Sequence, residues 1–159
     1  MSEGEQTRLI AWSRELRAVH DRLREALAVT RQALAAGETP EPAKSVTRDL
    51  LLLCHGFCTA LTAHHEGEDR TLFPAIAEQH PELRDTLDKL QQDHSMIAHL
   101  LAGLQAALAG AASVEQLDQH LEGVAAIMES HFRYEERRLL TVLEALTLDA
   151  DPHAVLGPL

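Results

Sequence analysis

Four long segments of this chain carry apolar residues that recur at alternating steps of three and four, the spacing of one face of an α-helix. Short stretches with Gly or Pro separate them, at residues 37–42, at His80–Pro81 and at residues 110–113. Four helices joined by such short connections predict an all-α fold, an antiparallel up-down-up-down four-helix bundle. The expected domain covers residues 1–147, and residues 148–159 form a short C-terminal tail without a clear period.

The boundaries of the predicted helices carry residues that suit helix ends. Gly37 fits a C-terminal cap, and Pro81 fits the first turn of a new helix. Ser113 and Gln116 have the spacing of a capping box, in which each residue satisfies a backbone N–H near the other. The fourth helix is therefore expected to begin directly after Ser113.

Each apolar face is interrupted near its middle by His or by a His/Glu pair. The polar residues at these core positions are His20, His64, Glu68, His94, His131 and Glu135. In an antiparallel bundle they would lie within about one helical turn of the same height. Buried carboxylates are costly without a compensating cation, and no Lys or Arg shares these faces at this level.

The second and fourth segments also resemble each other. HHEGEDRTLFPAI, residues 64–76, aligns without gaps on HFRYEERRLLTVL, residues 131–143, so that two His-x-x-x-Glu pairs coincide. VHDRLREAL around His20 likewise resembles DHSMIAHLL around His94. Each helical hairpin thus supplies one single His and one His-x-x-x-Glu pair on a common face. The alignment favours His64 over His65 as the inward residue.

Imidazole and carboxylate groups without Cys are ligands that suit iron, manganese or zinc. Glu and His side chains that point inward from facing helices are a known arrangement for two-metal sites in bundles. Four imidazoles, two bridging carboxylates and a bridging oxygen would fill roughly 10 of the 12 positions of two octahedra. The remaining positions leave room for a small ligand such as dioxygen, peroxide or nitric oxide.

The composition of the chain limits the classes of macromolecule that it is expected to bind. Fourteen Lys and Arg against 25 Asp and Glu give a net charge of -11, and only 3% of the residues are aromatic. Such a chain is not expected to bind nucleic acid or an anionic membrane surface. It shows no signal peptide and no apolar run long enough for a membrane span, which predicts a cytoplasmic location. Cys54 and Cys58 fit small helix-packing residues.

Taken with His20, the segments HHEGEDRTLFP, Asp93–His94 and HFRYEERRLL resemble the hemerythrin/HHE cation-binding family, across nearly the whole chain to about Leu146. The resemblance implies a non-haem site with two iron ions joined by an oxo or hydroxo bridge, for which manganese or zinc could substitute. It assigns the role of metal ligand to His20, His64, Glu68, His94, His131 and Glu135.

Two departures separate this sequence from the oxygen-carrying members of that family. Carriers have a second His one turn after the third-helix His, where this chain has Ala98, and a His-x-x-x-x-Asp pair on the fourth helix. The site is therefore expected to be more open, which favours peroxidase-like or catalase-like chemistry on peroxide, dioxygen or nitric oxide over oxygen transport. Alternatives are a binding module for oxygen or iron sensing or storage, and a helical interaction protein without metal.

Several residues near the ligands receive weaker expectations. His65 is expected to be exposed or to support a ligand rather than to bind metal, and a role for Glu66 stays open. Tyr134 would either hydrogen-bond a bridging oxygen or cover the site. His99 and His120 are expected to face solvent. No catalytic residue distinct from the metal ligands is predicted.

Overall fold

The computed structural model describes residues 10–36, 43–110 and 112–159, with only the backbone described for residues 43–50. Within these ranges every regular element is a helix and no strand occurs. The prediction of an all-α chain is thereby confirmed. The proposed helix cap at Gly37 lies outside the described residues.

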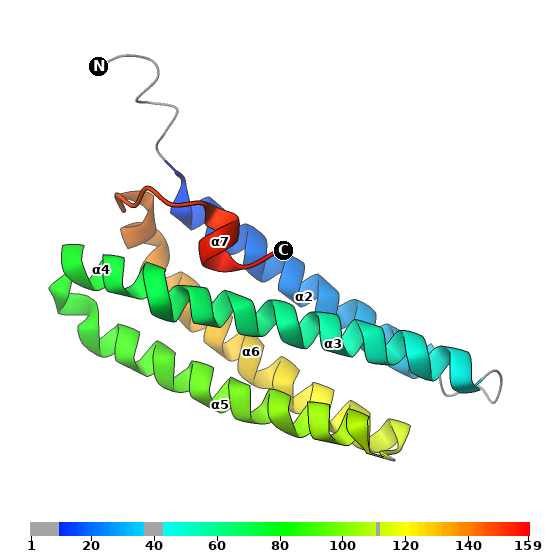
Figure 1. The fold of residues 1–159 in the computed structure, drawn as a ribbon. Helices are drawn as coiled ribbons and strands as arrows, with labels where there is room; N and C mark the ends of the chain where they lie inside the picture. The colour runs from blue at the N-terminus through cyan, green and yellow to red at the C-terminus, as the bar shows by residue number, and fades with distance from the viewer. Residues whose placement is uncertain (1–9, 37–42, 111) are drawn as a thin grey trace.

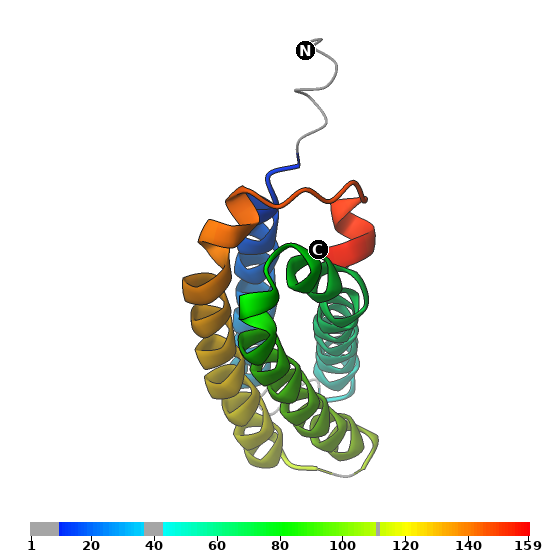
Figure 2. The same ribbon diagram turned by 90° about the vertical axis from the view of Figure 1, so that its left-hand side faces the viewer.

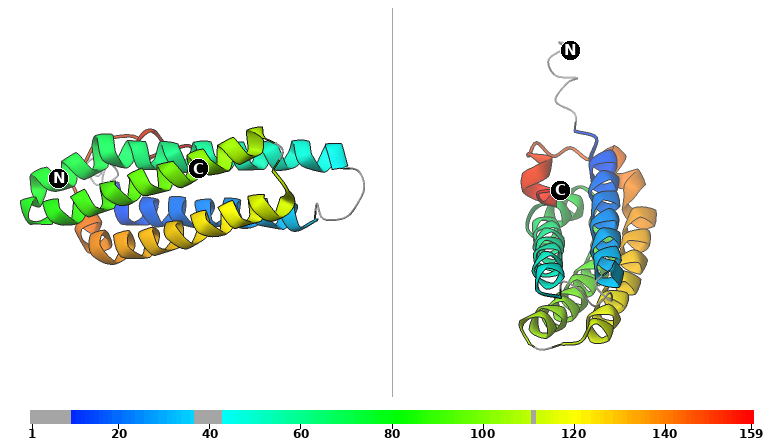
Figure 3. Two further views of the ribbon diagram at one scale, coloured as in Figure 1. Left: turned by 90° about the horizontal axis from the view of Figure 1, so that it is seen from below. Right: turned by 90° about the vertical axis from the view of Figure 1, so that its right-hand side faces the viewer.

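Four long helices form the body of the molecule (Figure 1). They are α2 (Trp12–Ala36), α3 (Ala43–Gly67), α5 (Arg84–Ala109) and α6 (Val114–Glu144). Helix α2 packs against α3 and α6, and α5 packs against the same two helices from the other side. The four therefore enclose one interior, as the views down and across the helices show (Figures 2 and 3).

Shorter helices make the chain more complex than the four predicted helices. The π-helix η1 (Glu68–Leu72) and helix α4 (Phe73–Gln79) continue the line of α3. The 3₁₀-helix η2 (Pro81–Leu83) leads into α5, and α7 (Pro152–Leu156) follows α6. A description of the fold as four simple helices therefore needs this correction.

The π-helix has a local cause in Pro74. Proline lacks an N–H, and its ring collides with the carbonyl of residue i−4 in a regular α-helix. The chain widens one turn before this point, where the Phe73 N–H donates to the Glu68 carbonyl, five residues back. The wider turn lets Pro74 stand near the start of α4, where no N–H is needed.

The predicted boundary signals between the long helices are present. Ser113 is the N-cap of α6: its side chain accepts from the Gln116 N–H, and the Gln116 side chain accepts from the Ser113 N–H. Pro81 lies at the start of η2, directly before α5. The capping box and the Pro81 boundary are thus confirmed.

The predicted apolar faces form the core. The fully buried aliphatic and aromatic residues include Trp12, Leu16, Leu23, Leu61, Leu72, Ile76, Leu90, Ile97, Leu104, Leu121, Val124 and Leu139. The six polar residues that interrupt these faces are buried among them, with exposed fractions from 0% to 5%. Burying polar groups at mid-core is costly unless they have partners, so these residues need an explanation.

The C-terminal segment packs onto the bundle in a way that its sequence did not indicate. Asp151 caps α7 by accepting from the His153 N–H, and Val155 and Leu156 are buried. Helix α7 contacts α3, η1 and α2. It approaches so closely that a Cβ atom on Gly67 would collide with the Val155 carbonyl. Only glycine fits at position 67 without displacing α7.

Within the described part of the chain, no helix combines the length and the apolar character that crossing a membrane requires.

Candidate metal centre

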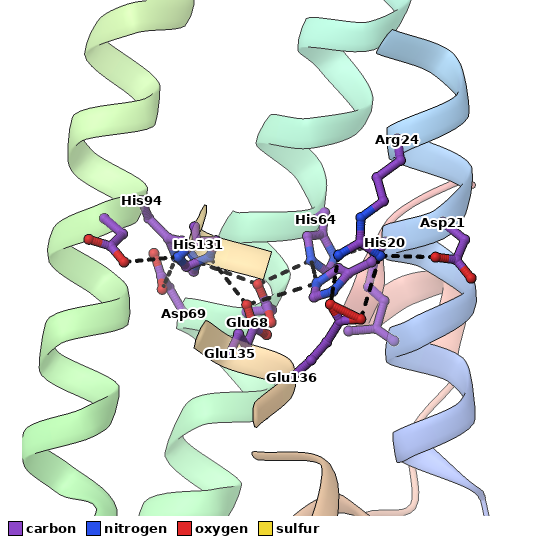
Figure 4. Close-up of polar contacts among 12 residues, drawn as sticks. His20, Asp21, Arg24, His64, Glu68, Asp69, His94, His131, Glu135 and Glu136 are labelled. Atoms are coloured by element: carbon purple, nitrogen blue, oxygen red, sulfur yellow. Dashed lines mark hydrogen bonds and ion pairs between the residues drawn. The ribbon is translucent and has the colours of Figure 1, made fainter. Parts of the chain in front are cut away.

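Four imidazoles from four helices meet in the interior. His20 of α2 and His64 of α3 bring their Nε2 atoms within 3.2 Å of each other. His94 of α5 and His131 of α6 bring theirs within 3.1 Å. The two pairs lie on opposite sides of the centre (Figure 4). All four rings therefore aim the same nitrogen inward.

Two carboxylates lie between the imidazole pairs (Figure 4). The Glu68 Oε1 atom is 3.2 Å from the Nε2 of His64 and 3.4 Å from the Nε2 of His94. The Glu135 Oε2 atom is 3.2 Å from the Nε2 of His131 and 3.9 Å from the Nε2 of His20. Each carboxylate thus connects one pair to the other. Their negative charge therefore lies where it would offset the charge of a bound cation.

Within the described ranges, the ion pairs of these two glutamates are with imidazoles and none is with Lys or Arg. Both side chains are 0% exposed, and none of their four oxygens has a hydrogen-bond partner among the described residues. Burial, and then the charge of Glu135, raise the pKa of Glu68 well above its usual range. Burial acts the same way on Glu135, but contacts with Glu68 and His131 hold its pKa well below that range. Two carboxylates buried this close together are a costly arrangement that a bound cation would offset.

The outer nitrogens, Nδ1, of His94 and His131 each contact an aspartate. The Nδ1 of His94 lies 2.7 Å from Asp69 Oδ1, and the Nδ1 of His131 lies 3.1 Å from Asp93 Oδ2. An N–H at Nδ1 that donates to a carboxylate leaves the lone pair at Nε2 facing inward. Histidine ligands to metals in proteins are commonly fixed in this way.

The other two imidazoles have different outer partners. The Nδ1 of His64 lies 2.9 Å from the Leu156 carbonyl oxygen on α7. The Nδ1 of His20 lies 3.7 Å from Glu136 Oε2, a longer contact. Burial, and then the neighbouring His20, lower the pKa of His64 to about 3. Its ring is therefore neutral, which is the form that binds a metal.

Arg24 holds Glu136 in place. Its Nη2 donates to Glu136 Oε2 at 2.7 Å and its Nε donates to Glu129 Oε2 at 2.9 Å, which ties α2 to α6. Burial acts to raise the pKa of Glu136, but its contact with the His20 ring and its hydrogen bond with Arg24 outweigh that effect and lower the pKa to about 2. The carboxylate behind His20 is therefore ionised.

The expectation for His65 needs a correction. Its side chain is not exposed: the residue is 5% exposed, and its ring stacks on His94 with centroids 3.9 Å apart and planes 12° apart. Consecutive residues on α3 both point inward because α3 has neighbours on two sides, α2 and α5. Glu66 faces the surface.

A surface pocket of about 170 Å³ lies beside α5. Ala98 lies in its wall, one turn beyond His94, and the rings of His65 and His94 lie there too. The remaining lining residues are Thr62, Glu66, Asp69, Ser95, Ile97 and Leu101. Ala98 itself is exposed, so this pocket is a hollow at the surface, and greater openness of the metal site stays a prediction.

The other residues near the site have simple surroundings. Tyr134 is half-buried and its ring faces the ammonium of Lys89, 4.5 Å from the ring centroid. His99 and His120 are exposed, as predicted. Cys54 and Cys58 are free thiols inside the core, consistent with packing residues.

Sequence reasoning missed the groups behind the imidazoles. Asp69, Asp93 and Glu136 each stand directly beside a predicted ligand, and that adjacency is the signal that could have identified them. Nothing in the sequence pointed to the Leu156 carbonyl, because a backbone oxygen carries no residue signature.

The donor set fits a metal site. Two groups of four residues place one ligand atom each within 4.8 Å of one another: His65, Glu68, His94 and His131, and His20, His64, Glu68 and Glu135. The fold and the site together define a helical metal-binding protein with His and Glu ligands.

A sequence model of the hemerythrin HHE cation binding domain matches residues 13–143. The chain belongs to this family. No curated protein and no solved structure gives a significant match to the chain.

Proposed function

We propose that this chain is a non-haem di-iron protein that turns over a small oxidant rather than an oxygen carrier. Peroxide is the preferred substrate, ahead of dioxygen and nitric oxide. His20, His64, Glu68, His94, His131 and Glu135 would hold the two ions in an up-down-up-down bundle. The observation that carries the proposal is the pair of buried carboxylates that lie between two imidazole pairs and have no hydrogen-bond partner in the described part of the chain.

The protein's contribution is to assemble and shield the centre. Iron would supply Lewis acidity and one-electron redox chemistry when bound. Glu68 and Glu135 contribute negative charge that offsets the cations, and the imidazoles are oriented from behind by Asp69 and Asp93. The apolar core keeps bulk water away, and a small molecule would approach the centre from the pocket that His65, His94 and Ala98 border.

Iron loading followed by peroxide consumption tests the proposal. Apo-protein is titrated with Fe(II) without oxygen, bound iron is measured, and oxygen evolution is followed after peroxide is added. Disproportionation converts two H₂O₂ into two H₂O and one O₂, so no external reductant is required. About two irons per chain and many turnovers are expected. A stable oxygen adduct that reverses on deoxygenation would contradict this proposal and favour transport.

Sensing or storage is a second candidate, favoured by the contact between His64 and α7. Because the His64 Nδ1 is paired with the Leu156 carbonyl, a change at the metal centre would act directly on the C-terminal segment. A difference in hydrogen exchange at residues 152–157 between the iron-loaded and the iron-free protein would support this candidate, provided that the protein takes up iron but does not turn over peroxide. The cytoplasmic location stays a prediction.

A further inference from the structure

His65 is the buried polar side chain next to the centre that the six predicted ligands leave unexplained. It is 5% exposed, and its Nε2 atom has no hydrogen-bond partner among the described residues. A buried nitrogen without a partner is unfavourable, because it loses its bond to water and gains nothing in return. An inward imidazole in this condition needs a partner that the protein itself does not supply.

The position of His65 places it with one half of the centre. One ligand atom of His65 and one from each of Glu68, His94 and His131 all lie within 4.8 Å of one another. The ring is stacked on His94 and lies 5.1 Å from the His131 ring centroid. His64, its neighbour in sequence, instead belongs with His20, Glu68 and Glu135.

Helix geometry explains how adjacent residues serve both halves. Successive side chains on an α-helix project about 100° apart. Because α3 packs against α2 on one side and α5 on the other, His64 faces the first and His65 the second. On α5 itself, the position one turn after His94 is Ala98, which lines the same pocket as His65. An imidazole from α3 therefore borders the space that Ala98 leaves.

We propose that His65 is a further metal ligand, which gives the half of the centre containing His94 and His131 a third imidazole. This inference rests on the proposed metal centre. It makes the two metal positions unequal: three imidazoles serve one, two serve the other, and Glu68 is common to both groups.

Two substitutions separate ligation from packing. His65→Phe keeps an aromatic ring against His94 but removes the nitrogens, whereas His65→Ala removes the ring and leaves space beside the existing pocket. His99→Ala is the matched control, because His99 is an exposed histidine on α5. Each apo-protein is titrated with Fe(II) anaerobically, and the thermal melting of each metal-free form is recorded.

Ligation predicts a specific pattern. The unmodified chain and His99→Ala should bind about two irons, while both His65 variants should bind one with unchanged affinity and the other about tenfold or more weakly. Added imidazole should restore the second iron to His65→Ala but not to His65→Phe.

Two results would overturn the inference, and they differ in what else they affect. Two irons bound with unchanged affinities by His65→Phe would show that His65 only packs on His94, and the metal centre itself would stand. An unmodified chain that binds no iron would remove the proposed function and this inference together.

Discussion

Individual side chains in the centre work in pairs, an inner imidazole nitrogen and an outer group that orients it. His94 shows the arrangement most completely: its Nε2 faces His131, its Nδ1 is 2.7 Å from Asp69, and its ring is covered by His65 and Phe73. Removing either half of such a pair should therefore have a distinct effect on metal binding.

Removal of an inner nitrogen should cost metal. His94→Ala is expected to lose at least one of about two bound metals and to lower the melting temperature of the loaded protein by roughly 5–10 °C. The reason is that metal binding stabilises the folded state, and each kcal/mol lost shifts melting by about 2–4 °C in a domain of this size. Metal analysis and thermal melting measure both effects, with His99→Ala as the control. Full metal content in His94→Ala would remove His94 from the ligand set.

Removal of an outer carboxylate should weaken binding without changing stoichiometry. Asp69→Asn and Asp93→Asn are each expected to lower metal affinity about 10–100-fold. The reason is that the imidazole that each aspartate orients would lose its charged hydrogen-bond acceptor. Competition with a chelator of known affinity measures this change. Asp88→Asn, on an exposed position of α5, should leave affinity unaltered. Equal affinities in all three variants would show that these acids do not orient the rings.

The residues of the candidate metal centre could be predicted to different degrees. Six were recognisable because they interrupt apolar faces at the same level, a pattern that solvent-facing residues do not produce. Asp69, Asp93 and Glu136 were not, since acidic residues at partly exposed positions look like any hydrated surface. Of the two roles expected for His65, exposure to solvent was wrong, because α3 has neighbours on two sides and can point two consecutive residues inward.

Among the elements, α3 and α7 depend on each other most closely. Gly67→Ala is expected to destabilise the protein by roughly 1–3 kcal/mol, because the added methyl group cannot fit against the Val155 carbonyl. Gly56→Ala is the matched control on the same helix: nothing lies within 4 Å of its Cβ position, so alanine should stabilise by about 0.5–1 kcal/mol.

Chemical denaturation of both variants measures these free energies of unfolding. Hydrogen exchange then locates the defect, which should be concentrated in α7 for Gly67→Ala. Equal stability in the two glycine variants would mean that α7 does not dock as closely as the structure shows.

The helices could be predicted where they were long enough to repeat the apolar spacing many times, and they were missed where they were too short to do so. Helices of 25 residues or more repeat their apolar pattern many times, so α2, α3, α5 and α6 were identifiable. Helix α7 has only five residues, too few for a period to be visible. The π-helix carried a signal, Pro74, but nothing in the pattern said whether the chain would break, bend or widen there.

For the molecule as a whole, access of small molecules to the centre is the property that would distinguish a protein that turns over peroxide from an oxygen carrier. Ala98→His should lower peroxide turnover while metal content stays unchanged, because the new side chain would fill the pocket wall beside His65. Ala102→His, one turn further along α5 at an exposed position, should keep full turnover. Loss of turnover in both variants would point to a general effect of added histidine.

The core thiols report on global unfolding. Burial raises the pKa of Cys54 to about 11, and burial together with Cys54 raises that of Cys58 to about 11. At pH 8 only about one thiol in a thousand would be ionised, so alkylation of the folded protein should be very slow. Removing metal with a chelator should speed alkylation by increasing the unfolded population. Mass spectrometry follows the labelling; rapid modification of the metal-loaded protein at pH 8 would contradict the expectation.

The contact between His64 and α7 also sets an order in time. During synthesis, α2, α3, α5 and α6 leave the ribosome before α7, and with them come Asp69, Asp93 and Glu136. The acceptor for His64 comes later, as the Leu156 carbonyl. A nascent chain could therefore collapse into a bundle with every inner nitrogen present while the Nδ1 of His64 still lacks its acceptor. We therefore expect full competence for metal only after the bundle has formed, when α7 docks on Gly67 and the Leu156 carbonyl oxygen reaches His64.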